Sequence, residues 1–157
     1  MRTFFQYRIA QPTDAAVCIV IRGLTRENAI SAEHLESLGI TNASSNNSIH
    51  DCTLPGVVCI NEDRIIGYCF GERYSGEIIV LALLPEFEGK GLGKILLART
   101  SQILVEYDHS RLFLGCSPDS KTRSYGFYRN LGWRSTNTYD NNGDEILEYF
   151  PAANGDA

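Results

Sequence analysis

Three glycines at alternate positions, Gly89, Gly91 and Gly93, form the most chemically informative feature of this sequence. They lie between an apolar stretch typical of a strand and a segment with the apolar spacing of a helix. Glycine lets the backbone turn sharply and approach a ligand, while the first turn of a helix offers unpaired N–H groups and the positive end of the helix dipole. With the cationic side chains of Lys90 and Lys94 beside it, the turn predicts a phosphate site.

Two well-known glycine-rich phosphate motifs do not fit this turn. The dinucleotide-binding pattern G-x-G-x-x-G would need a glycine at Lys94 if it began at Gly89, or at Leu96 if it began at Gly91. A P-loop that ended at Gly93-Lys94 would need glycine at position 88 and serine or threonine at position 95, where this chain has glutamate and isoleucine. The turn therefore belongs to a different kind of phosphate binder.

The turn resembles the motif Gln/Arg-x-x-Gly-x-Gly/Ala, with which the GNAT superfamily of N-acetyltransferases grips the pyrophosphate of acetyl-coenzyme A. The match runs from Glu88 to Gly93. The resemblance also includes the preceding apolar stretch 77–84 and the aromatic stretch 125–133, in the order and spacing of the family. It covers roughly the middle and the last third of the chain, and the combination is far more specific than any single part.

The resemblance implies that acetyl-coenzyme A is the acetyl donor. Glu88 stands where the family usually has Gln or Arg, and because a carboxylate would repel a pyrophosphate, we expect its side chain to turn outward while backbone amides bind. Family members use a backbone N–H on the preceding strand as the oxyanion donor, which Leu83 or Leu84 would supply here. Lys121, where the family often has Asn, and Arg123 either reach the coenzyme A phosphates or are solvated. The implied cofactor residues are Leu83, Leu84, Glu88, Gly89, Lys90, Gly91, Leu92, Gly93, Lys94 and Lys121.

The transfer that the resemblance implies needs a base, because an amine with a pKa of about 10.4 is almost entirely protonated at pH 7. Glu77 lies at the family's distance before the phosphate motif and is the candidate base. By the period-two alternation of a strand, its side chain should share a face with Ile79, Leu81 and Leu83. The alternative is a solvated glutamate at a strand end, and Glu72 is then the nearest substitute.

Tyr128 occupies the position of the family's Phe-Tyr pair, where a tyrosine hydroxyl donates its proton to the departing thiolate of coenzyme A. Tyr125, Tyr128 and Leu131 also fall on one helical stripe, so Tyr128 can be a core aromatic at the same time. Cys116 is not expected to be a nucleophile, since no histidine is near it in sequence and buried free cysteines are common. The five cysteines show no metal-ligand spacing with the three histidines, so no metal is expected.

The segments that must position these residues alternate between short apolar strands and amphipathic helices. Strands are expected at 4–9, 57–60, 65–70, 77–84, 111–116, 133–139 and 145–150. Helices are expected at 13–23 with Thr13 as the cap, 31–38 with Ser31 as the cap, 91–107, and from Ser117-Pro118 to Gly132, while the Asn- and Ser-rich tract 41–48 is predicted to be a loop. The predicted fold class is α/β (α+β): a GNAT-like mixed, mostly antiparallel sheet of about six to seven strands, flanked by about four helices. The resemblance implies a splay between the fourth and fifth strands, with a bulge near Ala82.

The size and charge of the chain bound its function. A length of 157 residues predicts one domain, which we place at 1–151 with a flexible tail at 152–157. A net charge of −5 argues against broad nucleic-acid binding and favours an amine-bearing acceptor. No apolar stretch reaches the roughly twenty residues of a membrane span, and the odd cysteine count with no signal peptide favours the cytoplasm.

The sequence thus predicts an N-acetyltransferase that acts on a primary amine of a small molecule or a peptide by direct attack in a ternary complex. The acceptor itself stays open among small amines, amino acids, antibiotics and protein N-termini, and so does the choice between a monomer and a homodimer. In the family, the acceptor is framed by regions that here contain Arg22, Arg26, Glu27, Tyr139, Asp140, Asp144 and Glu145. The alternative is a catalytically idle module that binds or senses acyl-coenzyme A.

Overall fold

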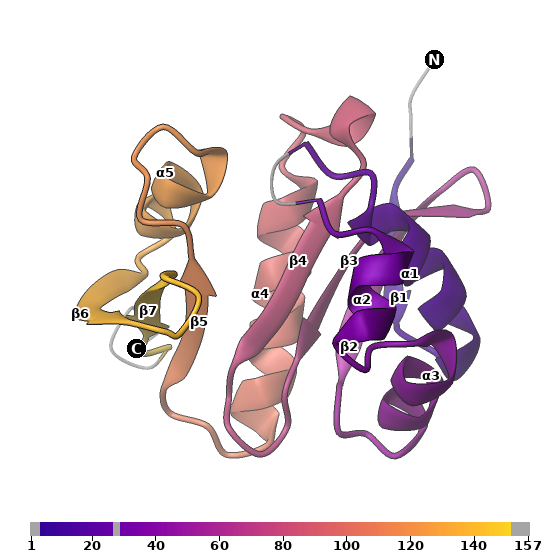
Figure 1. Cartoon of the computed structure of the whole chain (residues 1–157), viewed down its shortest axis with the longest axis horizontal. Helices are drawn as coiled ribbons and strands as arrows, with labels where there is room; N and C mark the ends of the chain where they lie inside the picture. Colours follow the sequence, from indigo (N-terminus) through magenta and orange to yellow (C-terminus); the bar gives the residue numbers. More distant parts are fainter. Residues whose placement is uncertain (1–3, 27–28, 152–157) are drawn as a thin grey trace.

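The computed structural model describes residues 4–26 and 29–151, so Glu27 and the tail expected at 152–157 lie outside the described residues. One antiparallel sheet has the strand order β1-β2-β3-β4, and a second has the order β5-β7-β6 (Figure 1). The strands are β1 (Gln6–Ile9), β2 (Gly56–Asn61), β3 (Arg64–Gly71), β4 (Ile78–Leu83), β5 (Leu112–Cys116), β6 (Arg134–Tyr139) and β7 (Glu145–Tyr149). The helices are η1 (Pro12–Asp14), α1 (Ala15–Arg22), α2 (Ala32–Ser37), α3 (Asn42–His50), η2 (Pro85–Phe87), α4 (Leu92–Glu106) and α5 (Arg123–Asn130). The expected mixed α/β class is confirmed.

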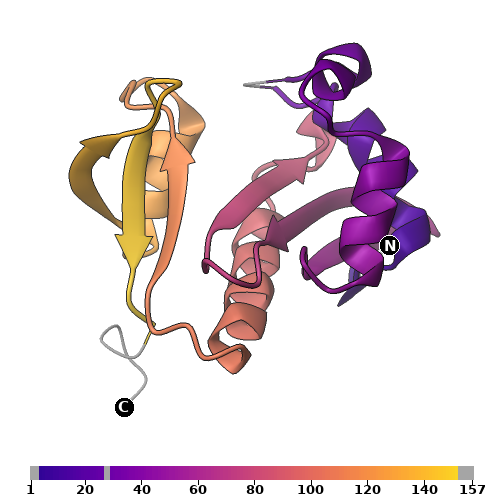
Figure 2. The ribbon, with the colours of Figure 1, turned by 60° about the horizontal axis from the view of Figure 1, so that its bottom comes forward.

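The two sheets touch at the beginning of β4 and β5 and then separate. Glu77 and Phe113 form an isolated parallel bridge, and the N–H of Phe113 donates to the carbonyl oxygen of Gly76 at 3.3 Å. Beyond this bridge the second sheet, with α5, stands apart from the first (Figures 1 and 2). The splay expected between the fourth and fifth strands is therefore present.

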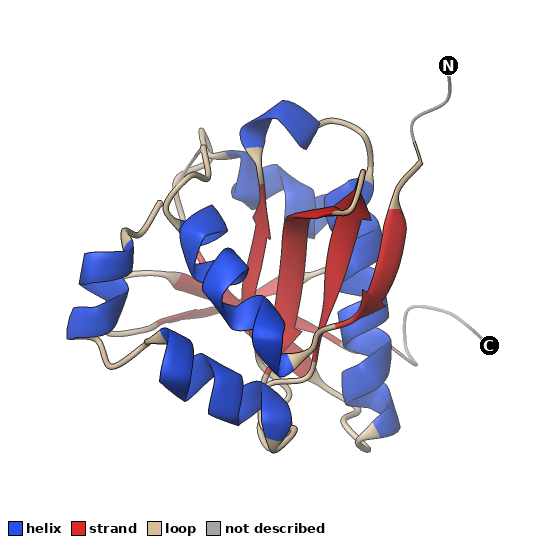
Figure 3. Ribbon diagram, turned by 90° about the vertical axis from the view of Figure 1, so that its right-hand side faces the viewer, coloured by secondary structure: helices blue, strands red, loops and turns tan. Residues whose placement is uncertain are grey.

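Helices cover both faces of the four-stranded sheet (Figure 3). On one face α4 lies close to β3, because Gly67 and Gly71 leave room for the side chains of Leu96 and Leu104. On the other face α1 packs against β3. The core between these layers is apolar and contains fully buried Leu96, Leu104, Ile66 and Val58. None of the helices within the described ranges is long and apolar enough to cross a membrane.

The Asn- and Ser-rich tract is a helix, α3, and the expectation of a loop is wrong. Its first turn is closed by a reciprocal pair of contacts: the Thr41 hydroxyl accepts from the N–H of Ser44 at 3.1 Å, and the Ser44 hydroxyl accepts from the N–H of Thr41 at 2.9 Å. Ile49, which is 8% exposed, anchors the other end in the core. Capping and one buried contact thus outweigh the weak helix propensity of Asn and Ser.

Two predicted helix starts are also wrong. The first helical segment begins at Pro12 with Gln11 at the N-cap, instead of with Thr13 as the cap. The last helix begins at Arg123 instead of at Ser117-Pro118, because residues 117–122 fold into turns in which the Ser117 hydroxyl and the Asp119 carboxylate accept backbone N–H groups. The other two predicted signals are confirmed: Ser31 caps α2, and Gly132 follows the end of α5 with a φ of 99°.

Candidate active site

A cavity of about 980 Å³ opens where β4 and β5 part. Its walls come from β4, the glycine turn, the start of α4, the end of β5, α5 and the segment after α1. Of the predicted site residues, those that line it are Leu83, Glu88, Gly89, Gly91, Leu92, Gly93, Lys94 and Tyr128, whereas Glu77, Leu84, Lys90 and Lys121 do not. The volume lies within the range of roughly 300–1,000 Å³ that is usual for small-molecule sites.

The glycine turn adopts the backbone geometry of an anion cradle. Gly89 and Gly91 have φ angles of 79° and 80°, in the left-handed region that disfavours other residues. Gly91 is the N-cap of the 15-residue α4, which has no side-chain cap, and the N–H of Ile95 is the first to donate back to the carbonyl of Gly91, at 3.4 Å. The N–H groups of Leu92, Gly93 and Lys94 therefore have no carbonyl partner within the helix and lie at the cavity wall.

Glu88 lines the cavity and its carboxylate faces two arginines that line it too, so the expected outward orientation is wrong. Its side chain is 15% exposed and accepts a hydrogen bond from Nε of Arg26 at 2.9 Å. Nη1 of Arg123 lies 3.5 Å from the same oxygen. Arg26 follows α1 and Arg123 begins α5. Two cations from different walls of the cavity therefore compensate the negative charge of Glu88.

Tyr128 lies on the wall opposite the glycine turn. Its ring packs edge-on against Phe127 and Trp133, with centroid distances of 5.0 and 6.0 Å. Burial raises the pKa of its hydroxyl, nearby Cys69 and Cys116 raise it further, and Arg22 lowers it. The hydroxyl therefore keeps its proton at neutral pH and can donate it.

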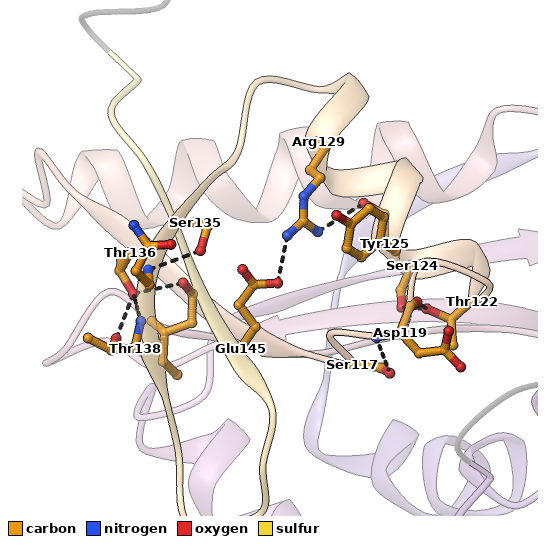
Figure 4. A network of polar contacts seen from close by, with 12 residues as sticks. Ser117, Asp119, Thr122, Ser124, Tyr125, Arg129, Ser135, Thr136, Thr138 and Glu145 are labelled. Atoms are coloured by element: carbon orange, nitrogen blue, oxygen red, sulfur yellow. Dashed lines mark hydrogen bonds and ion pairs between the residues drawn. The ribbon is translucent and has the colours of Figure 1, made fainter.

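A polar network behind this wall holds α5 against β7 (Figure 4). Nη2 of Arg129 donates to Glu145 at 2.6 Å, and Nη1 donates to the carbonyl oxygen of Tyr125 at 3.2 Å. The guanidinium also lies over the Tyr125 ring, 3.6 Å from its centroid. Hydrogen bonding from Ser135 lowers the pKa of Glu145 despite the opposing effect of burial, and Arg129 lowers it further. Glu145, which was expected near the acceptor, is thus a structural ion-pair partner that positions the helix of Tyr128.

A bulge in β4 changes the face to which Glu77 belongs. Gly71 pairs with Ile78 and Phe70 pairs with Val80, so Ile79 is the extra residue and the bulge expected near Ala82 lies three positions earlier. The extra residue reverses the alternation, which puts Glu77 on the opposite face of the strand from Leu81 and Leu83. The face predicted for Glu77 is therefore wrong: it lies on the side of α1.

Two carboxylates near the junction of the sheets have raised pKa values. Burial raises the pKa of Glu77, and the charges of Glu72 and Asp140 raise it further. Burial and then Asp140 raise the pKa of Asp144, which lines the cavity. Both groups are stronger bases than ordinary carboxylates, as proton acceptance requires.

The backbone of β4 offers its free edge to the cavity. The N–H of Leu84 donates to the carbonyl oxygen of Ile66 at 2.9 Å and is therefore engaged in the sheet. Because hydrogen-bonded and non-hydrogen-bonded pairs alternate along an antiparallel ladder, the N–H groups of Leu81 and Leu83 face away from β3. They are the free donors of this strand edge.

Sequence reasoning gave Arg26 no part in the phosphate site, although it named the residue near the acceptor. Its only sequence signal is a cation that follows an apolar helix, far from the glycine turn. Cys116 lines the cavity, and burial raises the pKa of its thiol, in keeping with the expectation that it is no nucleophile.

Comparisons with known proteins identify the family to which this chain is similar. Residues 26–133 match the model of the acetyltransferase (GNAT) family, whereas no curated protein sequence matches the chain significantly. The PaiA N-acetyltransferase of Thermoplasma acidophilum, solved in complex with coenzyme A, superposes with a TM-score of 0.79 at 20% identity, over 94% of this chain and 99% of that one. YncA of Salmonella typhimurium, solved with its cofactor acetyl-CoA, gives 0.72 at 15% identity, over 98% and 96%. The ribosomal-protein-alanine N-acetyltransferase of Brucella melitensis gives 0.68 at 17% identity, over 92% and 99%.

Proposed function

Because this chain belongs to the GNAT acetyltransferase family, we propose that it transfers an acetyl group from acetyl-coenzyme A to a primary amine by direct attack in a ternary complex. The observation that carries the proposal is the uncapped start of α4 behind Gly91, which faces a cavity with Tyr128 on its other wall. The structural neighbours PaiA and YncA contain coenzyme A and acetyl-CoA, which supports the same ligand here.

The residues of the cavity fit this cofactor. The N–H groups of the turn from Gly89 to Lys94 would hold the diphosphate, with Arg26 and Arg123 as the nearest cations. The free N–H groups of Leu81 and Leu83 would bind the pantetheine arm and the acyl oxygen. Lys90 and Lys121, both exposed, would at most attract the phosphates from outside the cavity.

Acetyl-coenzyme A supplies a thioester, an acyl donor that needs no covalent bond to the protein. Tyr128 would donate its proton to the departing sulfur, and Leu83 would donate a hydrogen bond where negative charge develops on the acyl oxygen. Glu77 would accept the proton of the amine through a water, because its carboxylate lies outside the cavity lining. Asp144 is the rival for that role, since it lines the cavity.

The proposal extends to the setting of the reaction. Residues 1–151 act as one domain, and the acceptor is an amine of a small molecule or a peptide. Five cysteines without disulfide bonds fit the reducing cytoplasm. The idle acyl-coenzyme A module stays the second candidate, favoured by the carboxylate of Glu88 inside the phosphate end of the cavity.

The test is the release of coenzyme A from acetyl-coenzyme A in the presence of a panel of primary amines. We expect Tyr128→Phe to lower kcat by about 100-fold or more while acetyl-coenzyme A binding, measured by calorimetry, is unchanged. Tyr125→Phe on the same helix is the matched control and should keep its activity. Binding without turnover by the wild-type protein across the whole panel would favour the idle module instead.

A further inference from the structure

A second cavity of about 440 Å³ lies beside the first, between α1, α2 and α3 and the adjoining face of β3 and β4. Its walls are mainly apolar and include Leu35, Leu38, Ile40, Ile49, Tyr68 and Phe70. Leu38 and Ile40 at its rim are 60% and 42% exposed, so the described residues leave this apolar surface uncovered. Such a hollow favours a ligand that can bury hydrocarbon.

The second cavity adjoins the proposed cofactor cavity. Four residues line both of them: Arg22, Ile30, Ile79 and Val80. Ile79 is the bulged residue of β4 and is 45% exposed. The bulge thus lies at the junction, where the amine of an acceptor would meet the thioester.

The charges around the junction discriminate between amines. None of the described residues that line the second cavity carries a carboxylate. Their polar groups are the serine hydroxyls of α3, the Tyr68 hydroxyl, the Cys18 thiol and the guanidinium of Arg22. A second ammonium group would therefore enter mainly apolar surroundings in which no described lining residue supplies a carboxylate counterion. A hydrocarbon group would not carry this cost, and apolar walls also favour the neutral, nucleophilic form of the reacting amine.

From this geometry we infer that the acceptor is a primary monoamine with an aliphatic or aromatic group, which occupies the second cavity while the amine reaches the junction at Ile79. The inference rests on the proposed function and names the acceptor class of the same site.

The experiment uses the wild-type protein saturated with coenzyme A and measures, by calorimetry, the binding of ethylamine, butylamine, hexylamine and 1,4-diaminobutane. Affinity should rise by roughly three- to fourfold for each added methylene that becomes buried. Butylamine should bind at least about tenfold more tightly than 1,4-diaminobutane, which has the same chain and one more charge. Turnover of the same amines with acetyl-coenzyme A is measured in parallel.

A variant that fills the second cavity tests whether the dependence of affinity on chain length arises there. Ser45 lies on α3 and lines this cavity, so Ser45→Phe should abolish the gain from ethylamine to hexylamine and leave ethylamine binding nearly unchanged. Ser110→Phe, at an exposed position outside both cavities, is the matched control and should bind like the wild type. Thermal unfolding shows whether each variant is folded, and the wild-type series does not depend on either variant.

The outcomes separate this inference from the proposed function. Equal affinity across the alkyl series, or tighter binding of 1,4-diaminobutane than of butylamine, would overturn the inference even if acetyl transfer takes place. Length-dependent binding without turnover would support the second cavity as the site for apolar amines and would instead contradict the transfer reaction.

Discussion

Glu88 places a negative charge where the family motif usually has Gln or Arg, and it is paired with two arginines, Arg26 and Arg123. Removing this single charge should change the affinity for coenzyme A. The partners are exposed, 58% for Arg26 and 60% for Arg123, so each ion pair contributes about 1 kcal/mol or less. Glu88→Gln removes the carboxylate that both guanidinium groups now face, so the repulsion between this carboxylate and the diphosphate disappears. Calorimetry should show roughly three- to tenfold tighter binding of coenzyme A at low salt.

The control for this prediction is Glu86→Gln, a nearby exposed glutamate outside the cavity lining, which should bind coenzyme A like the wild type. Weaker binding by Glu88→Gln would contradict the prediction and would mean that the carboxylate holds the arginines in place for the ligand.

Glu77 carries the prediction on pH dependence. Because burial, Glu72 and Asp140 raise its pKa, the carboxylate becomes a base only when the pH rises above that elevated value. The acid limb of the wild-type profile of kcat/KM should therefore lie above the usual glutamate pKa of about 4.3. Glu77→Gln should lower kcat/KM by about 100-fold or more near neutral pH and remove this limb.

Two further variants identify the base if Glu77→Gln stays active. Glu72→Gln tests the neighbouring carboxylate, and Asp144→Asn tests the one that lines the cavity. The variant whose pH profile loses the acid limb identifies its substituted residue as the proton acceptor.

Among the elements, the junction of β1 and α1 depends on Asp14, which is 5% exposed. Its carboxylate accepts from both terminal nitrogens of Arg8, at 2.8 and 3.0 Å, and from the N–H of Gln11 at 2.7 Å. Burial alone would raise the pKa of Asp14, but these hydrogen bonds outweigh it and lower the pKa. Asp14→Asn should lower the free energy of unfolding by about 1–3 kcal/mol at pH 7, because Arg8 and Gln11 lose a charged acceptor.

The stabilisation by Asp14 should depend on pH. A lowered pKa stabilises the fold above the unfolded-state value of about 3.9, and the contribution disappears as the pH falls through the lower folded-state value. Urea titrations at pH 7 and at decreasing pH below 4 should therefore show the difference between the variant and the wild type shrinking. Asp63→Asn, at an exposed turn, is the control, and a difference that does not change with pH would refute the electrostatic origin.

The elements also show what a sequence can predict. The strands and α4 follow from apolar alternation and spacing, and the turn at 89–93 follows from glycines with left-handed backbone angles. The helix α3 was missed because its signal is a pair of hydroxyl caps and one buried side chain, Ile49, in a segment with weak propensity. Local composition does not contain the tertiary contact that selects the helix.

Some residues of the candidate site could be predicted from the sequence, and others could not. Tyr128 and the glycine turn stand at motif positions, so their places in the cavity could be expected. Glu88 depends on an arginine 62 residues earlier in the chain, and Glu77 depends on a bulge that one extra residue creates. Such long-range pairing and strand register arise only when the sheets assemble.

For the whole molecule, the two sheets separate around the cavity, so a bound cofactor should connect them and stabilise the fold. One isolated bridge, Glu77 with Phe113, joins β4 to β5, and a ligand in the cavity would contact both walls beyond it. Coenzyme A at 100 times its dissociation constant should add about 2.7 kcal/mol to the free energy of unfolding. For a chain of this size, each kcal/mol corresponds to about 2–4 °C in Tm, so the midpoint should rise by roughly 5–10 °C.

The shape of the same melting curve tests the proposal of a single domain. If residues 1–151 fold as one unit, differential scanning calorimetry should show one transition both with and without coenzyme A, because the two sheets share the buried core around Leu96, Leu112 and Leu147. Pantetheine, which lacks the diphosphate, is the control and should shift the midpoint much less if the N–H groups at the start of α4 bind the anion as proposed. Two transitions would mean that the sheets unfold separately, and an equal shift by pantetheine would place the binding energy outside the glycine turn.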